Sequence, residues 1–583
     1  MNKQQLLGML LSGIFYAAPA QAQSWQWLNR GGGHQDNYAA ATAEEAVTHM
    51  ATDRNGNVYV LSYLVGPGDV AGHTVSQDDK YTATLLSSFR CDGSFRWAKL
   101  LDLNVVSGLA TDSLDGVYLS GANQSGVFRM GSISGAVPDT AWSWAPGNKH
   151  MMLIKMDTAG VRKWMRFPQP DTTGALSFLN YAPLDMDVEP NGKVHWMCRL
   201  AGGAYAGGAL VVGSTGNYVL RYDAAGNYSG HTLLQLNSAD PDPYSIDYAN
   251  TFLKRTAAGN GYLLTCLQDT LDGSLLKAGT TTIRSNAFIA RYNDLGNVDW
   301  LRQGEGSITA RPAVDARDNI YLAGCAKGNS TLFNGFKAVN EYSNLAYFSP
   351  LVIKLDASGN PLWTHNSSAI AATTATGVAI TDSALVVTAT YASPFKWSGA
   401  GDSLLQPVGT GANPLVSRFR ALDGKYLRTD TIAGKDGSFD YSNAVASDRF
   451  GNVYIGGRFG DSLLLGGHYT RSAGGDNDFF VAKYGSSNCS KVVKTTSIAP
   501  VETLSNMLHC YPNPVSGNLT VENNGILPLQ LQLSDISGRS IWQSQLPAGA
   551  RQQYAMTLLP AGMYLLRAIA EDGSLQYRKV SKY

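Results

Sequence analysis

The histidines of this chain do not follow the spacing of a known catalytic or metal-binding motif. The nine histidines lie far apart, at residues 34, 49, 73, 150, 195, 231, 365, 468 and 509. No H-E-x-x-H zinc motif, G-x-S-x-G nucleophile elbow or P-loop occurs. His195 lies in the apolar run VHWMCRL and is interpreted as a strand residue, not a ligand. We therefore expect no catalytic residue, no metal site and no cofactor.

Two groups of carboxylates come closest to a cation site. One precedes the pair Asn191-Gly192 and comprises Asp185, Asp187 and Glu189. In an EF-hand loop the glycine directly follows the ligand at position five, and here it is displaced. The other group lies in SADPDPYSIDY and comprises Asp240, Asp242 and Asp247. A turn explains the first group and a solvated loop the second, so we adopt neither as a metal site.

The six cysteines show neither a CxxC pair nor metal-ligand spacing. Three of them lie in apolar runs and are expected to be buried thiols, namely Cys198, Cys266 and Cys325. Cys489 and Cys510 bracket a polar connector and are candidates to pair with each other.

Exposed aromatic residues are the remaining candidates for recognition. Two stretches, 124–150 and 326–349, exceed ordinary connections and contain aromatics among small polar residues, namely Trp142, Trp144, Tyr342 and Tyr347. Such aromatics can stack on sugar rings or anchor a protein partner. The alternative is that these stretches simply contain the middle strands of their own repeat unit, which every unit needs.

A repeated turn must position all these side chains. The phrase DRNGNVYV at residues 53–60 returns as DRFGNVYI at residues 448–455, and five further copies begin near residues 110, 187, 255, 314 and 380. In Asp-x-x-Gly between apolar runs, glycine accepts a positive φ angle and aspartate caps the turn. Each copy therefore predicts a strand, a tight turn and a second strand.

A second phrase, with an apolar strand, a turn and usually a tryptophan, lies between these copies. Four of its six copies carry a tryptophan four residues after the turn glycine, namely Trp97, Trp164, Trp300 and Trp363. The third and sixth copies carry Gly230 and Arg428 there. Two hairpins per repeat give four strands, and seven repeats predict an all-β fold, a seven-bladed β-propeller spanning residues 23–488.

The two ends of this region predict how the ring closes. The seventh repeat ends at FFVAKYGSSN and lacks the tryptophan strand. The missing strand is found at SWQWLNRGGG from Ser24, where WLNRGGG matches WLRQGEG at Trp300. We therefore expect an N-terminal strand to complete the last blade and hide its edge.

Composition and the first residues indicate export. Charged residues make up 15% of the chain, and 45 basic residues balance 45 acidic ones, so no nucleic-acid footprint is present. Residues 1–22 combine Lys3, an apolar stretch and the A-x-A site Ala20-Gln21-Ala22, the features of a signal peptide. No later stretch reaches 18 uninterrupted apolar residues, so we expect no transmembrane segment.

The sequence pattern changes after residue 488. Residues 489–509 are polar, lack the turn phrases and are expected to form a linker. Residues 510–583 contain alternating apolar residues, as at Leu529, Leu531 and Leu533. This alternation predicts a small Ig-like β-sandwich.

Both regions resemble known bacterial families. The patterns D-x-x-G-N-x-Y and apolar-K-x-D-x-x-G-x-x-x-W resemble the SBBP-type propeller repeats, which transfer no catalytic residue. Residues 510–583 resemble the type A C-terminal sorting domain of the type IX secretion system in Bacteroidota. The positions that carry this resemblance are Tyr511, Pro512, Asn513, Pro514, Asp535, Gly538, Arg539, Gly562, Tyr564, Lys579 and Lys582.

The second resemblance implies a route and a destination. It implies passage through the type IX secretion machinery, removal of the sorting domain by its sortase, and release or attachment to the outer-membrane surface. We therefore hypothesise a noncatalytic scaffold that binds an extracellular glycan or protein. The alternative is a propeller enzyme acting on polysaccharide or peptide, and a third is a purely structural surface protein.

Overall fold

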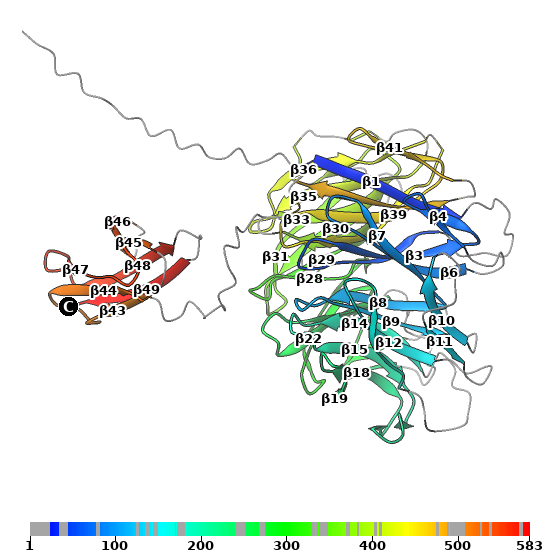
Figure 1. The fold of residues 1–583 in the computed structure, drawn as a ribbon, viewed down its shortest axis with the longest axis horizontal. Helices are drawn as coiled ribbons and strands as arrows, with labels where there is room; N and C mark the ends of the chain where they lie inside the picture. Colours follow the sequence, from blue (N-terminus) through cyan, green and yellow to red (C-terminus); the bar gives the residue numbers. More distant parts are fainter. Residues whose placement is uncertain are drawn as a thin grey trace, which may run out of the picture. The chain divides into compact units, whose positions relative to one another are not determined.

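The computed structural model is all-β over the residues that it describes: 24–33, 45–76, 82–123, 127–133, 140–143, 150–168, 171, 181–238, 251–267, 275–327, 333, 336, 348–368, 374–381, 384–401, 405–406, 411–435, 437–473, 477–486, 489, 508–524, 528–535, 539–570 and 575–583. The chain divides into an N-terminal body, residues 1–491, and a C-terminal body, residues 492–583 (Figure 1). Each body is described by itself.

Within the described part of the N-terminal body, seven antiparallel four-strand paths follow one another, named here the first to seventh sheets. The first three sheets are β2 (Val47–Thr52), β3 (Val58–Val65), β6 (Thr82–Phe89) and β7 (Phe95–Leu101); β8 (Val105–Thr111), β9 (Gly116–Asn123), β12 (His150–Asp157) and β13 (Arg162–Arg166); and β14 (Ala182–Val188), β15 (Val194–Leu200), β18 (Gly216–Tyr222) and β19 (Tyr228–Leu233).

The remaining four sheets repeat this pattern. They are β21 (Thr251–Arg255), β22 (Gly261–Cys266), β25 (Ala287–Asn293) and β26 (Val298–Gly304); β28 (Ala313–Val314), β29 (Ile320–Lys327), β30 (Phe348–Leu355) and β31 (Pro361–Ser368); β32 (Ala375–Ile380), β33 (Ala384–Tyr391), β35 (Asn413–Arg420) and β36 (Tyr426–Thr431); and β38 (Tyr441–Ser447), β39 (Val453–Phe459), β42 (Asp478–Gly485) and β1 (Ser24–Gly33). Four-strand antiparallel sheets in succession are the pattern of propeller blades.

Shorter strands extend the sheets or form small sheets of their own. Strands β4 (Gly68–Val70) and β5 (His73–Val75) extend the seventh sheet. Strands β10 (Val127–Ser132) and β11 (Thr140–Ser143) extend the first sheet, and β27 (Ser307–Ile308) and β34 (Lys396–Trp397) extend the fifth. The separate small sheets are β16 (Gly203–Tyr205) with β17 (Leu210–Val212); β20 (Leu236–Ser238) with β23 (Leu276–Ala278) and β24 (Thr281–Thr282); and β37 (Ala433–Gly434) with β40 (Ser462–Leu465) and β41 (His468–Arg471).

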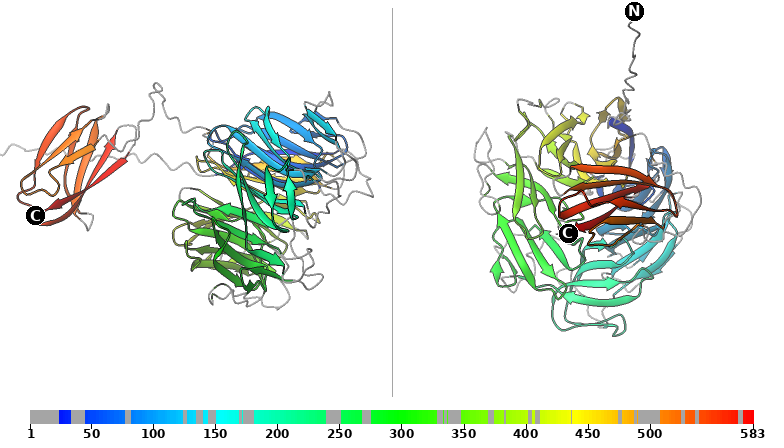
Figure 2. Two further views of the ribbon diagram at one scale, coloured as in Figure 1. Left: turned by 90° about the horizontal axis from the view of Figure 1, so that it is seen from below. Right: turned by 90° about the vertical axis from the view of Figure 1, so that its left-hand side faces the viewer.

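The first strands of neighbouring sheets lie side by side. Strand β2 contacts β8, β8 contacts β14, β14 contacts β21, and β38 contacts both β32 and β2. In the right-hand view of Figure 2 the sheets succeed one another in chain order, from blue to yellow. Three hydroxyl groups link them: Thr111 donates to the carbonyl of Thr52 (2.6 Å), Thr52 to that of Ser447 (2.7 Å), and Ser447 to that of Ile380 (2.8 Å).

The repeated phrase is a capped turn. The Asp53 carboxylate accepts hydrogen bonds from the backbone N–H groups of Asn55 and Asn57 and from the hydroxyl of Tyr59. Gly56 adopts a φ angle of 75°, which a residue without a side chain accommodates at little cost. The tyrosine therefore fastens the turn to the strand that follows it, which explains why the two residues recur together.

Where the second phrase carries a tryptophan, that residue joins its sheet to the next. The Trp164 indole donates to the carbonyl of Ala224 (3.1 Å), and a β-carbon added at Gly226 would stand 2.7 Å from the same ring. The same tight approach pairs Trp27 with Gly93, Trp97 with Gly160, Trp300 with Gly359 and Trp363 with Gly424. Each turn glycine therefore leaves space for the tryptophan of the preceding sheet.

The N-terminal strand lies where the sequence places it. Strand β1 pairs antiparallel with β42 from Ser24↔Gly485 to Gly31↔Phe479, at the edge of the seventh sheet (Figure 1). Trp27 of this strand donates to the carbonyl of Cys91 (2.9 Å) in the turn between β6 and β7. The N-terminus therefore contributes to the seventh sheet and touches the first.

The suggested pairing of Cys489 with Cys510 is wrong. Cys489 forms a disulfide with Cys91, and their Cα atoms lie 5.3 Å apart although 398 positions separate them in the sequence. The sequence reasoning missed this pair because only folding brings the end of β42 beside the β6–β7 turn. Cys510 is free, and the three cysteines expected to be buried in strands are indeed buried and free: Cys198, Cys266 and Cys325.

The C-terminal body consists of two antiparallel sheets. One contains β43 (Leu508–Tyr511), β44 (Asn518–Asn523) and β47 (Arg551–Ala555), and the other contains β46 (Ser540–Leu546), β45 (Leu529–Asp535), β48 (Gly562–Ala570) and β49 (Leu575–Lys582). Both sheets contribute to one buried cluster, including Leu519 and Val521 from the first and Leu531, Leu533 and Leu566 from the second. The alternating leucines are therefore the inward-facing residues of a strand.

Candidate functional site

The aromatic residues expected to bind a ligand remain untested. Trp142 lies in β11, opposite Phe128 of β10, in a hairpin that extends the first sheet beyond β7. Trp144, Tyr342 and Tyr347 lie outside the described residues, as does the acidic segment around Asp242. The stretch 124–150 contains β10 and β11, but these strands extend the first sheet at β7 and are not middle strands of the second sheet, in whose part of the sequence they lie.

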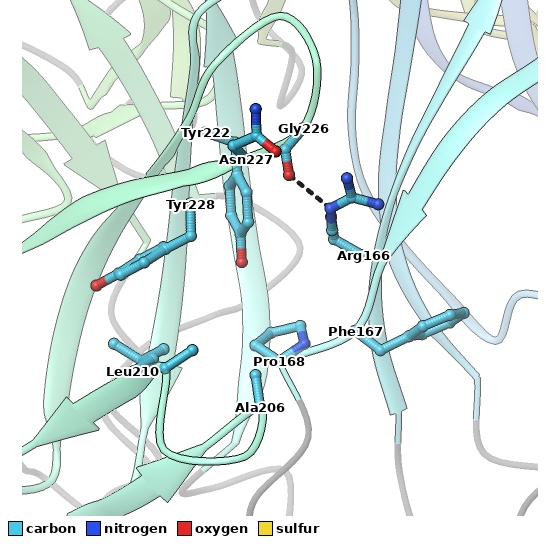
Figure 3. Close-up of a pocket in the computed structure, with 10 residues that line it drawn as sticks. Arg166, Phe167, Pro168, Ala206, Leu210, Tyr222, Gly226, Asn227 and Tyr228 are labelled. Atoms are coloured by element: carbon cyan, nitrogen blue, oxygen red, sulfur yellow. Dashed lines mark hydrogen bonds between the residues drawn. The ribbon is translucent and has the colours of Figure 1, made fainter.

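The structure instead shows a pocket between the second and third sheets (Figure 3). Its volume is about 270 Å³. It lies beside the contact between Trp164 and Gly226, between the end of β13, the β18–β19 hairpin and the β16–β17 hairpin. The lining residues are Arg166, Phe167, Pro168, Ala206, Ala209, Leu210, Tyr222, Gly226, Asn227 and Tyr228. The pocket is mostly apolar, with a few polar groups, as is common for small-molecule sites.

Two tyrosines form one wall of the pocket. The rings of Tyr222 and Tyr228 pack edge to face, with their centroids 5.8 Å apart. The hydroxyl of Tyr228 is 2.6 Å from Nδ1 of His231, which holds this ring in place. Figure 3 shows the Tyr222 phenol pointing toward Pro168 and the Tyr228 phenol pointing away from it. The pocket therefore presents aromatic surface that is already positioned.

The Tyr222 hydroxyl is the central polar group of the pocket. The side chain is only 5% exposed, and its hydroxyl forms no hydrogen bond with another described residue. Burial raises the pKa of Tyr222 above its ordinary value, although Arg166 opposes this effect. The phenol therefore stays protonated at neutral pH and can both donate and accept a hydrogen bond.

Two further polar side chains border the pocket. Arg166 donates Nε to the carbonyl of Gly226, Nη1 to that of Met165 and Nη2 to that of Ala225. A guanidinium has five N–H donors, so two of them remain for a ligand. The amide of Asn227 donates Nδ2 to Asp223 (2.9 Å), which leaves its Oδ1 as an acceptor.

A second hollow lies beside β23, β24 and β26. It has a volume of about 430 Å³ and is lined by Gln235, Asn237, Ala278, Gly279, Thr280, Thr281 and Val298. None of these lining residues is aromatic or charged. It therefore offers a ligand neither a flat stacking surface nor an ionic contact.

Charged residues from several sheets meet at the inner strands. The cluster contains His49 of β2, Asp185 and Asp187 of β14, Lys254 of β21 and Arg311, which lies between β27 and β28. Arg311 pairs with Asp185 and donates to the carbonyls of Met186 and Leu253. Asp187 pairs with Lys254 at 2.9 Å. We call these five residues the inner-strand cluster.

The pKa values of this cluster follow from burial and from its ion pairs. Burial raises the pKa of Asp185 to about 7, with Arg311 opposing the shift. Burial also raises that of Asp187, but Lys254 and Arg311 outweigh it and hold the pKa below its ordinary value. Burial and the charge of Arg311 lower the pKa of His49 to about 3. The two aspartates are engaged with Arg311 and Lys254, which favours a structural role for the acids of this cluster.

His195 lies in β15 and substitutes for the repeat tyrosine. Its Nε2 is 2.7 Å from the Glu189 carboxylate, and its Nδ1 is 3.0 Å from the hydroxyl of Tyr262 in the fourth sheet. Glu189 stands six residues before His195, as Asp53 stands six before Tyr59. An acid–imidazole–phenol row can relay protons in principle, but His195 and Tyr262 are fully buried and out of reach of a substrate.

The carboxylates of Asp185 and Asp187, which belong to the group compared with an EF-hand loop, are bonded to other groups of the protein. The backbone N–H groups of Leu253 and Arg255 donate to Asp185 and Asp187 respectively. Across the described residues, no group of three or more potential ligand side chains is arranged to hold a metal ion.

The sorting-motif residues hold the C-terminal body together. Asn513 donates to the carbonyl of Lys579 (2.6 Å) and accepts from the N–H of Ser581 (2.8 Å), which ties the Tyr-Pro-Asn-Pro segment to β49. Asp535 lies opposite Tyr564 in the β45–β48 pair and accepts from Arg539. The hydroxyl of Tyr564 donates to the carbonyl of Pro560 (2.8 Å). Gly538 lies outside the described residues.

The C-terminal residues match a described protein family. Residues 509–582 match the family called secretion system C-terminal sorting domain. This tail implies secretion or cell-surface export and involvement of the type IX secretion machinery. Among the described residues, no helix has the length and apolar character needed to cross a membrane. The chain matches no curated protein sequence.

Solved propellers and a designed protein are similar to the chain at low identity. The WD40 domain of Neurospora crassa Pan2 is 10% identical, with 65% of this chain and 89% of that chain covered and a TM-score of 0.30. The Dos1 propeller is 8% identical, with 79% of this chain and 95% of that chain covered and a TM-score of 0.38. The computationally designed Ika8 protein is 12% identical, with 80% of this chain and 100% of that chain covered and a TM-score of 0.32. The strand pairing, and not these likenesses, indicates propeller blades in the N-terminal body.

Proposed function

We propose that the chain is a surface-delivered propeller protein of the type IX secretion system that binds an extracellular ligand without transforming it. The match of residues 509–582 to the sorting domain carries this proposal. Export begins with removal of residues 1–22 as a signal peptide. The sorting domain, residues 510–583 after a linker at 489–509, is then removed by the sortase as the protein reaches the surface of a Bacteroidota cell.

We further propose that the seven sheets are blades of a closed seven-bladed propeller of the SBBP type, followed by an Ig-like sandwich. The pairing of β1 with β42, the contact of β38 with both β2 and β32, and the disulfide from Cys489 to Cys91 support closure. The two sheets around one core support the sandwich.

The binding role is supported by the pocket between the second and third sheets. It combines aromatic walls with the Tyr222 hydroxyl, which forms no hydrogen bond with another described residue. The ligand is a glycan or a protein segment. The enzymatic alternative has less support, because the acids of the inner-strand cluster are already bonded to cations and backbone amides.

The proposed export route and the proposed binding role can be tested by separate measurements. Deleting residues 510–583 should leave the protein in the periplasm, and surface delivery of the truncated protein would overturn the sorting assignment. Glycan-array and partner pull-down experiments should find a ligand for the exported protein. Turnover in a glycosidase or peptidase screen, without any binding partner, would favour the enzyme instead.

A further inference from the structure

We propose that the pocket between the second and third sheets binds a single pyranose ring of an extracellular carbohydrate. This inference rests on the binding role proposed above and names its ligand class and site. The argument depends on three features of the lining: its aromatic and apolar faces, its unpartnered hydroxyl, and the mixture of donors and acceptors around it.

The apolar faces suit the C–H groups of a sugar. A pyranose ring presents a patch of C–H groups on one face and hydroxyl groups at its edge, and aromatic rings pack against such patches. Tyr228 and Tyr222 supply aromatic surface, and Pro168 and Leu210 supply aliphatic surface opposite to it (Figure 3). The tyrosine rings are held by their mutual contact and by His231, so binding a rigid ring orders few side chains.

The polar groups suit hydroxyls, which both donate and accept. The Tyr222 hydroxyl points toward Pro168, another lining residue, and forms no hydrogen bond with another described residue (Figure 3). It is therefore free to donate a hydrogen bond to a ligand hydroxyl and to accept one from it. The spare N–H groups of Arg166 are donors, and Oδ1 of Asn227 is an acceptor. An entirely apolar ligand would leave all three unsatisfied.

The lining also argues against a cationic ligand. Arg166 is the one charged residue among the ten that line the pocket. The carboxylate closest in sequence, Asp223, is occupied by the backbone N–H groups of Ala225 and Asn227 and by the Asn227 amide. A neutral or acidic sugar is therefore accommodated, and an amine is not.

The test titrates the full chain with methyl pyranosides of glucose, galactose, mannose, N-acetylglucosamine and glucuronic acid, followed by saturation-transfer NMR and calorimetry. At least one should bind, and Tyr222→Phe should weaken its binding about tenfold, the loss expected for one hydrogen bond. Ala209→Trp should abolish binding by filling the exposed mouth of the pocket. Tyr469→Phe, on an exposed ring in β41, should change nothing.

The possible outcomes distinguish failure of the proposed pyranose site from failure of the proposed binding role. If a sugar binds and neither pocket variant affects it, the pocket assignment is overturned and the binding role stands. If no pyranoside binds but a protein partner is captured, the sugar is wrong and the binding role again stands. If neither a sugar nor a partner binds, both proposals fail. Unchanged unfolding temperatures for the two variants exclude misfolding as the cause of lost binding.

Discussion

The indole of Trp27 lies against Gly93, so that a β-carbon at position 93 would stand 2.6 Å from Cγ of the ring. The strand that carries Trp27 belongs to the seventh sheet, and Gly93 belongs to a turn of the first. The same tryptophan–glycine contact recurs between consecutive sheets, including Trp164 with Gly226. The seventh and first sheets are therefore joined by the same tryptophan–glycine contact that joins the first to the second, the second to the third, the fourth to the fifth and the fifth to the sixth.

Gly226→Ala should destabilise the N-terminal body more than Gly451→Ala. Both glycines have a φ angle of 82°, but a β-carbon at 226 meets Trp164 at 2.7 Å, whereas at 451 it meets nothing within 4 Å. We expect a cost of about 1–2 kcal/mol for the φ angle in both and a further ~1–3 kcal/mol of overpacking at 226. Chemical unfolding measures the difference, and equal losses would contradict the packing role of the glycine.

Loss of the Cys91–Cys489 disulfide should lower the free energy of unfolding by about 2–4 kcal/mol. The bond joins positions 398 apart, so it restricts the unfolded chain strongly. The double variant Cys91→Ser with Cys489→Ser should show this loss in thermal unfolding. Reductant should lower the stability of the natural protein and leave the double variant unchanged; an equal effect of reductant on both would refute the assignment.

Glu45→Gln should flatten the pH dependence of stability between pH 4.5 and 7. Glu45 accepts hydrogen bonds from Gly33 and Val65, and burial, with a smaller contribution from Asp478, raises its pKa from 4.5 to about 7. Since the folded-state pKa is the higher one, protonation stabilises the fold fully below pH 4.5, by up to about 3 kcal/mol, and this is lost as pH rises through 7.

The isosteric glutamine keeps an oxygen acceptor and cannot ionise, so thermal unfolding of the two proteins across this range isolates the effect. The natural protein should lose stability relative to the variant as pH rises. Burial also raises the pKa of Asp478, to about 6, so the variant retains a smaller slope. Parallel stability curves for the two proteins would mean that Glu45 does not titrate in this range.

Asn513→Ala should destabilise the C-terminal body by about 1–3 kcal/mol, because it removes two hydrogen bonds to β49. Tyr511→Phe is the matched control, since its hydroxyl makes only a long contact of 3.4 Å with Glu522. Surface delivery can be followed in the same variants. If Asn513→Ala abolishes delivery while unfolding is unchanged, the residue serves recognition and not folding.

Much of the fold could be predicted because its signals are local. The Asp53–Gly56–Tyr59 turn is encoded within seven residues, and its copies mark one hairpin in every sheet. The match between Trp27 and Trp300 anticipated the place of the N-terminal strand, since both residues pack on a turn glycine of the next sheet. Patterns of this kind depend on neighbours in sequence and are visible in one chain.

The pocket and the disulfide could not be predicted in this way. Tyr222 and Pro168 belong to different sheets, and only the packing of those sheets brings them to one pocket. Cys91 and Cys489 likewise meet because the last sheet returns to the first. Contacts between residues far apart in the sequence leave no local pattern. By contrast, the replacement of the repeat tyrosine by His195 can be recognised in the sequence, because Glu189 stands six residues before it, the same spacing as in the other copies.

The position of Cys489 determines how the protein carries mechanical load. Cys489 lies near the end of the N-terminal body, which extends to Lys491, and it follows β42, which ends at Gly485. A pull transmitted along residues 490–507 meets a covalent bond to Cys91 before it reaches the hydrogen bonds of β42. Tension on the tail would therefore be shared between the first and seventh sheets, and the disulfide would protect the last strand from being peeled away.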